Sequence, residues 1–354
     1  MTWLKRQVRP EQIRELSLLL LIVAAVLIFG SLIDGYYTSR TFVRISTSVA
    51  VIAVAAVGQT LVMLTRNIDL SVGSVVGCTA YVVGSLLGQF KGAAPAEAIA
   101  ACLLMGGLLG ALNGALVAYG GVPSIIATLG TLAIYRGTLV SYSGAKTVTT
   151  ASLPAWVVDL PRLNAATIAG LDLRLLVAIA VALVIVVQLA LTFLNAGRTF
   201  YAIGSNPDAA KLIGLPIRRT VFAAFVLSGA LAGLCGFMTL ARFGNITTEA
   251  ARGLELQVVA AAVVGGVNIF GGSGTVVGAL LGAVMIGTLE QSLFRLQVSE
   301  FWRDALLGLL ILLAVASDAL LLKRLRALWG RADLKLVAPA AAGRPLRSEK
   351  AAAS

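Results

Sequence analysis

The stretch GQTLVMLTRNIDLSVGSVVG, residues 58–77, places Arg66, Asn67 and Asp69 between two apolar runs. A charged side chain within a bilayer is costly unless it is paired, capped or in contact with water. Because the apolar pattern resumes directly after Ser71, we expect a break between two helices, with Asp69 as the N-cap of the second helix and Arg66 as its charge partner. The alternatives are a charged turn and a broken helix that lines a translocation path.

The composition around this stretch is typical of a membrane protein. The chain is 58% hydrophobic and 12% charged, with a mean hydropathy of +0.94, whereas soluble domains carry about 25% charged residues. The net charge of +12 does not indicate nucleic-acid binding, because Lys and Arg fall in the tails and short loops between apolar segments. We therefore expect an all-α, polytopic integral membrane protein that is surrounded by the lipid bilayer and has no nucleic-acid partner.

About ten apolar segments have the length of roughly 20 residues that a hydrocarbon core of about 30 Å requires. The first is expected to be an uncleaved span, because residues 34–37 (DGYY) offer no small-residue cleavage pattern. Two short spans are expected within 257–291, on either side of a break at 268–274, which matches the first break near 66–70. The predicted spans are 16–33, 46–65, 71–90, 97–118, 124–142, 173–194, 220–241, the two within 257–291, and 302–322.

The distribution of basic residues predicts that both termini are cytoplasmic. With ten crossings, the inner side collects 17 of the 28 Lys and Arg residues, and eight of these 17 lie between Lys323 and Lys350. We expect three regions: a basic cytoplasmic tail (1–15), a transmembrane domain (16–325) and a cytoplasmic tail (326–354). The last region is too poor in large apolar residues to fold.

Two glycine rows predict close helix packing. Gly106, Gly110 and Gly114 are spaced four apart, and so are Gly274, Gly278 and Gly282; such rows allow a neighbouring helix to approach closely. The second row overlaps a possible internal repeat, in which 67–77 matches 268–278 at an offset of 201 residues. A true repeat would place both breaks at the inner ends of matching helix pairs; chance similarity in a Gly- and Val-rich chain is the alternative.

Several kinds of chemistry are missing from the sequence. There is no histidine, which excludes Ser-His catalysis and the H-E-x-x-H zinc site. The three cysteines have no C-x-x-C spacing, so neither a disulfide framework nor a metal site is expected. Residues 144–147 (GAKT) lack the glycine before lysine that a phosphate loop needs. The energy for any transport must therefore come from an ion gradient or from a partner protein.

The loop 195–220, NAGRTFYAIGSNPDAAKLIGLPIRRT, carries a helix-start signal. The run Asn206-Pro207-Asp208 favours the start of a short helix through Ala209, Ala210 and Lys211, and Gly214 favours its end. A short helix in a basic inner loop fits a docking element. An ordinary interfacial loop is the alternative.

This loop is similar to the coupling segment of ABC importer permeases, in which two alanines, three residues and a glycine fit a groove on the ATPase subunit. Four stretches from 61–74, 112–137, 197–214 and 262–283 resemble the ribose-type family of sugar importer permeases, and the resemblance extends over about 15–322. Within the family, TRNID at 65–69, YRG at 135–137 and FWRD at 301–304 are most similar to autoinducer-2 importer permeases. Rhamnose-type permeases are the alternative, and many relatives have Gly where this chain has Asn67.

The resemblance implies a non-catalytic permease subunit in the bacterial inner membrane. Its implied partners are an ATP-binding subunit that holds ATP and Mg, a second permease chain that is the same or similar, and a periplasmic substrate-binding protein. No cofactor is expected in this chain. The implied ATPase-coupling residues are Asn206, Pro207, Asp208, Ala209, Ala210, Lys211 and Gly214.

A neutral sugar-like ligand such as autoinducer-2, rhamnose, ribose or another monosaccharide needs neutral hydrogen-bonding groups along its path. The candidates within or near spans are Asn113, Thr128, Thr131, Gln257 and Asn268, and hydrogen bonds between helices are the alternative role for each. Two rival classes remain. An intramembrane enzyme needs a nucleophile and a base, and the histidine-free sequence offers no convincing pair. The other rival class is an ion-coupled secondary transporter. It usually carries carboxylates deep inside spans, whereas Asp69, Glu290 and Asp318 fall near predicted span ends.

Overall fold

The computed structural model describes residues 10–168 and 170–299, together with 302, 305, 306, 308, 309, 312 and 313. The predicted all-α class is confirmed, and a single short hairpin of β1 (Asn164–Ile168) and β2 (Leu171–Arg174) accompanies the described helices. The helices are α1 (Pro10–Leu32), α2 (Ser39–Leu64), α3 (Val72–Gln89), α4 (Pro95–Ala118), α5 (Ser124–Ser143), α6 (Ala155–Asp159), α7 (Leu175–Phe193), α8 (Asn195–Ser205), α9 (Pro207–Leu212), α10 (Ile217–Phe243), α11 (Leu254–Val264) and α12 (Val276–Arg295).

Among the described residues, eight helices are long and apolar enough to span a bilayer, and α11 is a shorter apolar helix. Each of the first nine predicted spans corresponds to one of these helices. The prediction of two short spans within 257–291 is half wrong, because α12 continues to Arg295 and has 20 residues. Most of the predicted span 302–322, the first nine residues and the whole of 326–354 lie outside the described residues.

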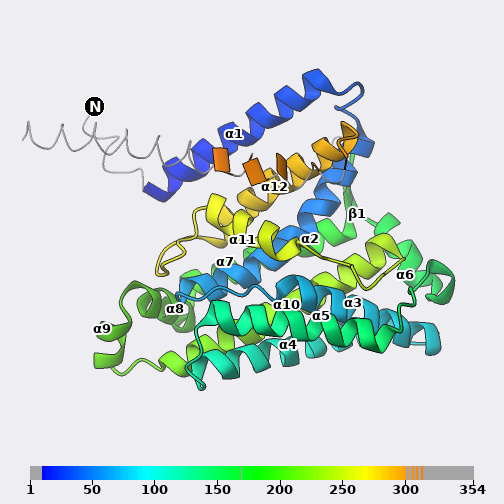
Figure 1. Ribbon diagram of the computed structural model, residues 1–354. Coiled ribbons are helices and arrows are strands. Elements are labelled where there is room, and N and C mark those ends of the chain that lie inside the picture. Colours follow the sequence, from blue (N-terminus) through cyan, green and yellow to red (C-terminus); the bar gives the residue numbers. More distant parts are fainter. Residues whose placement is uncertain are drawn as a thin grey trace, which may run out of the picture.

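The two ends of the helix bundle differ. Figure 1 shows α8 and α9 at one end, which we call the α9 end, and α6 and β1 at the opposite end, which we call the hairpin end. The first turns of α1 belong to the α9 end, because Arg14 Nη2 donates to the carbonyl of Val263, one residue before the C-terminus of α11 (2.9 Å). Chain segments far apart in sequence therefore meet at the α9 end.

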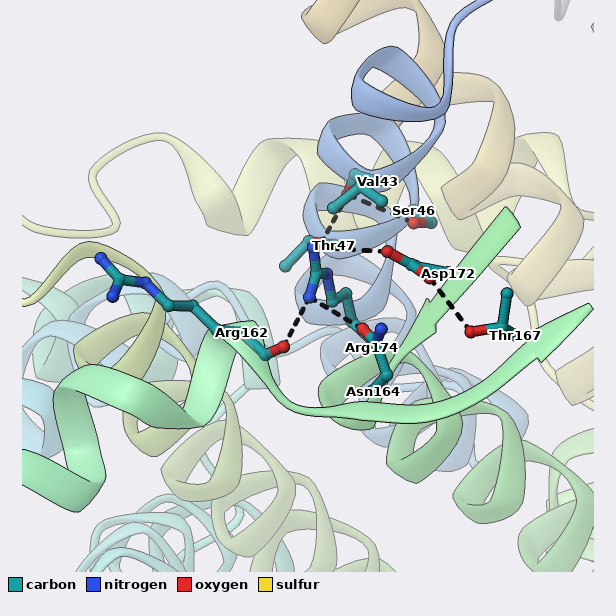
Figure 2. A network of polar contacts seen from close by, with 8 residues as sticks. All are labelled: Val43, Ser46, Thr47, Arg162, Asn164, Thr167, Asp172 and Arg174. Carbon is teal, nitrogen blue, oxygen red and sulfur yellow. Dashed lines mark hydrogen bonds and ion pairs between the residues drawn. The ribbon is translucent and has the colours of Figure 1, made fainter. Parts of the chain in front are cut away.

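The hairpin packs beside the first turns of α2, and Figure 2 shows the polar contacts that hold it. Arg174, the last residue of β2, donates through Nη1 to the carbonyl of Arg162 (2.5 Å) and to Asn164 Oδ1 (2.8 Å). Asp172 lies 3.9 Å from Arg174 Nη2 and accepts a hydrogen bond from Thr167 (3.1 Å). These contacts fix the start of α7 against the strand pair.

The glycine rows pack as predicted except at Gly274, which precedes the first residue of α12 and has a φ of 129°. Gly106, Gly110 and Gly114 of α4 lie against α10, so close that a Cβ atom at Gly106 would approach Gly233 N to 2.7 Å. In the second row, Gly278 and Gly282 of α12 lie against α11, where a Cβ atom at Gly282 would approach Gly265 N to 3.0 Å. Backbones in direct contact gain dispersion energy that bulky side chains would prevent, which is how small residues hold membrane helices together.

Candidate functional site

The first break, residues 65–71, turns back along α2 instead of leaving the bundle. The buried amide of Gln59 in α2, in the orientation that satisfies both groups, donates to the carbonyl of Asp69 (3.1 Å) and accepts from its N–H (3.3 Å). Buried main-chain groups without helical partners need such contacts. Gln59 therefore supplies to the break the hydrogen bonds that a continuous helix would have made internally.

The buried carboxylate of Asp69 also supports the break. Its Oδ1 accepts hydrogen bonds from the N–H (2.9 Å) and the hydroxyl (2.7 Å) of Ser71. The prediction that Asp69 is the N-cap is wrong by two residues, because Ser71 occupies that position and α3 begins at Val72. Residues 67–71 are not helical, and the Asp69 backbone pairs with Gln59 instead of forming the first helical hydrogen bonds. Asn113 Nδ2 of α4 donates to Ser71 Oγ (2.7 Å), which completes a chain of buried polar groups.

Two hydroxyl groups of α5 hold the other side of the break. Thr128 Oγ1 accepts from the N–H of Leu70 (3.1 Å) and donates to the carbonyl of Ser124 (2.8 Å). Ser124 Oγ accepts from the N–H of Ile68 (3.2 Å). The first break is thus tied to α2, α4 and α5 by side chains from each helix.

Arg66 does not pair with Asp69, so that prediction is wrong. Its guanidinium points to the C-terminal end of α8, where Nε donates to the carbonyl of Gly204 (2.6 Å) and Nη2 to that of Ser205 (2.9 Å). Arg66 has a positive φ of 66°, a backbone conformation that costs about 1–2 kcal/mol for a residue with a Cβ atom. The planar guanidinium matches two neighbouring carbonyls with two donors, and this pairing offsets the strain.

The second break, residues 265–275, contacts the C-terminal ends of α2 and α8, next to Arg66. The N–H of Gly272 donates to the carbonyl of Leu64, the last residue of α2 (3.2 Å). Gly272 has a φ of 72°, and a Cβ atom there would lie 2.5 Å from Ser205 N. Only glycine allows the two backbones to pass so closely. We call this meeting of the first break, the second break and the end of α8 the junction.

The short helix predicted between Asn206 and Gly214 is confirmed as α9. Asn206 Oδ1 accepts from the N–H of Ala209 (3.0 Å) and caps the helix, and Gly214 ends the turn with a φ of 77°. Because Asn206 directly follows Ser205, the cap of α9 is one peptide bond from the carbonyl that Arg66 holds. The junction and α9 are therefore one continuous structure.

The five path candidates occupy three places. Asn113 and Thr128 are buried at the first break, and Thr131 lies one turn further along α5, where its hydroxyl donates to the carbonyl of Thr128 (3.3 Å). Asn268 is exposed in the second break, and its Oδ1 accepts from the N–H of Phe270 (3.0 Å). Gln257 lies in the first turns of α11, at the opposite end of that helix from the second break.

Four residues of the site were absent from the sequence predictions: Gln59, Ser124, Gly204 and Gly272. Gln59 had a usable signal, since it is a polar side chain in an otherwise apolar run. Gly204 and Gly272 stand outside the rows with four-residue spacing and gave no such signal. The junction contains no nucleophile and base pair, and its parts can transmit a displacement between α9 and both breaks.

Comparison with known proteins agrees with this geometry. Residues 41–315 match the family described as "Branched-chain amino acid transport system / permease component". The chain is 37% identical over 306 residues to the autoinducer 2 import system permease protein LsrC of Shigella flexneri, with 86% of each chain covered. It is 36% identical over 305 residues to the protein of that name from Salmonella typhi, with 86% of this chain and 85% of the relative covered. No solved structure matches the chain significantly. The chain therefore belongs to this family of ABC-transporter permeases, as a multi-pass, non-catalytic membrane component.

Proposed function

We propose that the chain, with a second permease chain that is the same or similar, forms the membrane path of an ATP-driven importer for a small neutral sugar-like ligand. Autoinducer-2 is the favoured ligand, because relatives at 36–37% identity carry that ligand in their names. Rhamnose, ribose or another monosaccharide is the alternative ligand. The neutral path candidates Gln257 and Asn268 agree with a ligand that carries no charge.

The observation that carries the proposal is the exposed apolar tip of α9. The side chains of Leu212 and Ile213 are 88% and 74% exposed, whereas Ala210 on the same helix is buried. Exposed large apolar residues at one point of a surface mark a contact with a partner. We assign this tip to the ATP-binding subunit, with contact residues Asn206, Pro207, Asp208, Ala209, Ala210, Lys211 and Gly214 together with the tip.

Movement of α9 would reach the path through the junction. A shift of Ser205 displaces the carbonyls that hold Arg66, and with them the first break, and it also displaces Gly272 of the second break. We propose that the motif Arg66, Asn67, Asp69 and Ser71 acts as a gate at the α9 end of the path. Asn113, Thr128 and Thr131 support this gate, while Gln257 and Asn268 contact the ligand.

We assign one soluble partner to each end of the bundle. The ATP-binding subunit holds ATP and Mg and docks at the α9 end, and a periplasmic substrate-binding protein delivers ligand at the hairpin end. In this arrangement the chain lies in the bacterial inner membrane with both termini in the cytoplasm. The position of Arg14 at the α9 end supports this orientation for the N-terminus.

The test is reconstitution of the chain with candidate ATP-binding and substrate-binding proteins. The double variant Leu212→Ser and Ile213→Ser should lose the ATPase during copurification, because the contact with its groove is removed. The control Phe90→Ser changes a residue that is 65% exposed directly after α3 and should keep the ATPase. If the double variant retains the ATPase and uptake follows a proton or sodium gradient without ATP, the chain is a secondary transporter and the proposal is wrong.

A further inference from the structure

The segment between α10 and α11, residues 244–253, enters the bundle, and we call it the re-entrant segment. Its position beside three glycines of α3 shows how far it enters. A Cβ atom at Gly84 would lie 3.2 Å from Val148, and Val148 pairs with Ile246 at the start of the segment. A Cβ atom at Gly77 would lie 2.7 Å from the carbonyl oxygen of Ala250.

Further along the segment, a Cβ atom at Gly73 would lie 2.7 Å from the carbonyl oxygen of Ala251. At 1.5 Å per helical residue, Gly77 lies about 10 Å and Gly73 about 16 Å along α3 from Gly84. The segment therefore runs beside most of α3. Helix α11, which follows it, has 11 residues and a length of about 16 Å, and it ends at the second break at the α9 end, so its first residue lies about halfway across a hydrocarbon core of about 30 Å. Helix α11 therefore begins inside the bilayer.

Arg136 of α5 holds the re-entrant segment in place. Its Nη1 donates to the carbonyls of Thr248 and Ala250, both at 2.8 Å. These carbonyls have left α10 and have not yet entered α11, so the guanidinium replaces the partners that a helix would provide. Irregular backbone at this depth is tolerated only where it is buried in protein or lines a water-filled space.

The exposed side of the segment carries an ion pair. Arg252 Nη1 lies 2.6 Å from Glu249 Oε2, and the two side chains are 76% and 55% exposed. Charged groups at the middle of a bilayer do not face lipid tails, because the loss of hydration is too costly. This face of the chain therefore meets water or another protein chain.

We propose that the re-entrant segment lines the aqueous path, with Glu249, Arg252 and Gln257 as the side chains that a passing solute meets. The ion pair cancels in charge but offers carboxylate and guanidinium groups, which bind hydroxyl groups well. A neutral polyhydroxylated solute fits such a surface better than an ion does. This solute class rests on the proposed importer function, whereas the water access of the segment does not.

Water access is tested by cysteine modification in intact cells with a charged, membrane-impermeant methanethiosulfonate reagent. The native Cys78, Cys102 and Cys235 are buried and provide an unreactive background. The variants Arg252→Cys and Glu249→Cys should react. The matched control is Leu108→Cys, since Leu108 is 72% exposed near the middle of α4, and it should stay unmodified because it faces lipid.

Two outcomes overturn the proposal. One is that both variants react no faster than Leu108→Cys. The other is that they resist the reagent but form disulfides between two copies of the chain on oxidation, which makes this face a chain-to-chain interface. The assay needs neither ATP nor ligand, so its result is independent of the importer function.

The charge balance of the path is tested separately, by the relative reaction rates of anionic and cationic thiol reagents. In a Gln257→Cys background, anionic and cationic thiol reagents should react at similar rates relative to a free thiol. Adding Glu249→Gln removes one of the two carboxylates that interact with Arg252, Glu255 being the other, and should shift the ratio towards the anionic reagent. Adding Asp172→Asn in the hairpin should leave the ratio unchanged. If Glu249→Gln also leaves the ratio unchanged, the ion pair does not share a water space with Gln257 and the assignment fails.

Discussion

Arg66 Nε donates to the main-chain carbonyl of Gly204 at 2.6 Å, which joins the first break to the end of α8. The contact links residues 138 positions apart in the sequence. Its acceptor is a backbone atom, and the missing side chain of Gly204 is what lets α8 end this close, because a Cβ atom there would collide with the carbonyl oxygen of Leu64. A displacement of α9 that moves this carbonyl must either carry Arg66 along or break the bond.

The carboxylate of Asp69 distinguishes a structural role from a gating role. Asp69→Asn keeps an oxygen for the Ser71 N–H and should change the stability by at most about 1 kcal/mol. Asp69→Leu leaves buried donors without an acceptor and should cost about 1–3 kcal/mol. We expect Asp69→Asn to reduce transport per assembled complex in proteoliposomes while assembly stays normal. A normal transport rate for this variant would leave Asp69 with a purely structural role.

The contact between α4 and α10 provides a matched pair of glycines. Gly106→Ala places a Cβ atom 2.7 Å from Gly233 N and should destabilise the bundle by about 1–3 kcal/mol, because the helices must move apart. Gly107→Ala places its Cβ atom 3.8 Å from Ala230, an ordinary contact, and should leave the melting temperature unchanged or raise it slightly. Thermal unfolding in detergent measures both variants. Equal melting temperatures would mean that the glycine row is not what holds the two helices together.

The topology predicts that reporter fusions after residue 5 and after residue 340 both report a cytoplasmic location. The reason is the concentration of basic residues near each end. Fusions that report opposite sides would indicate an odd number of spans. The fusion after residue 5 also tests whether the α9 end of the bundle faces the cytoplasm, since Arg14 lies there.

Much of the fold could be predicted from the sequence because each span is a long apolar run with clear ends. The break at Arg66–Ser71 was visible as polar residues between such runs, and α9 was visible through Asn206, Pro207 and Gly214. The Gly106 row predicted a close helix contact, although not that α10 is the partner. These features depend on local composition and residue spacing, and both can be recognised in a single amino-acid sequence.

The junction could not be predicted in the same way. The nearest opposite charge to Arg66 in the sequence is Asp69, yet backbone carbonyls of α8 satisfy the guanidinium. Backbone acceptors leave no trace in the sequence, since every residue has one. The re-entrant segment was missed for a related reason: its polar residues resemble an ordinary outer loop, and only its contacts with α3 and with Arg136 place them at depth.

In the proposed mechanism Arg66 transmits the movement of α9 to the first break, and a comparison of transport with ATP hydrolysis tests this role. Arg66→Gly removes the side chain and relieves the positive φ, whereas Arg66→Ala removes the side chain and keeps the strain. If Arg66 affects only stability, the two variants should differ, with Arg66→Gly the more stable. If Arg66 couples α9 to the first break, both variants should lose uptake to the same extent.

In proteoliposomes that contain the permease and the ATPase and binding protein proposed as its partners, ligand uptake and ATP hydrolysis are measured per assembled complex for both variants. We expect uptake to fall by about 5- to 150-fold in both variants, the range that coupling energies of about 1–3 kcal/mol produce, while ATP hydrolysis continues. Uptake that stays in constant proportion to ATP hydrolysis in both variants would contradict this expectation.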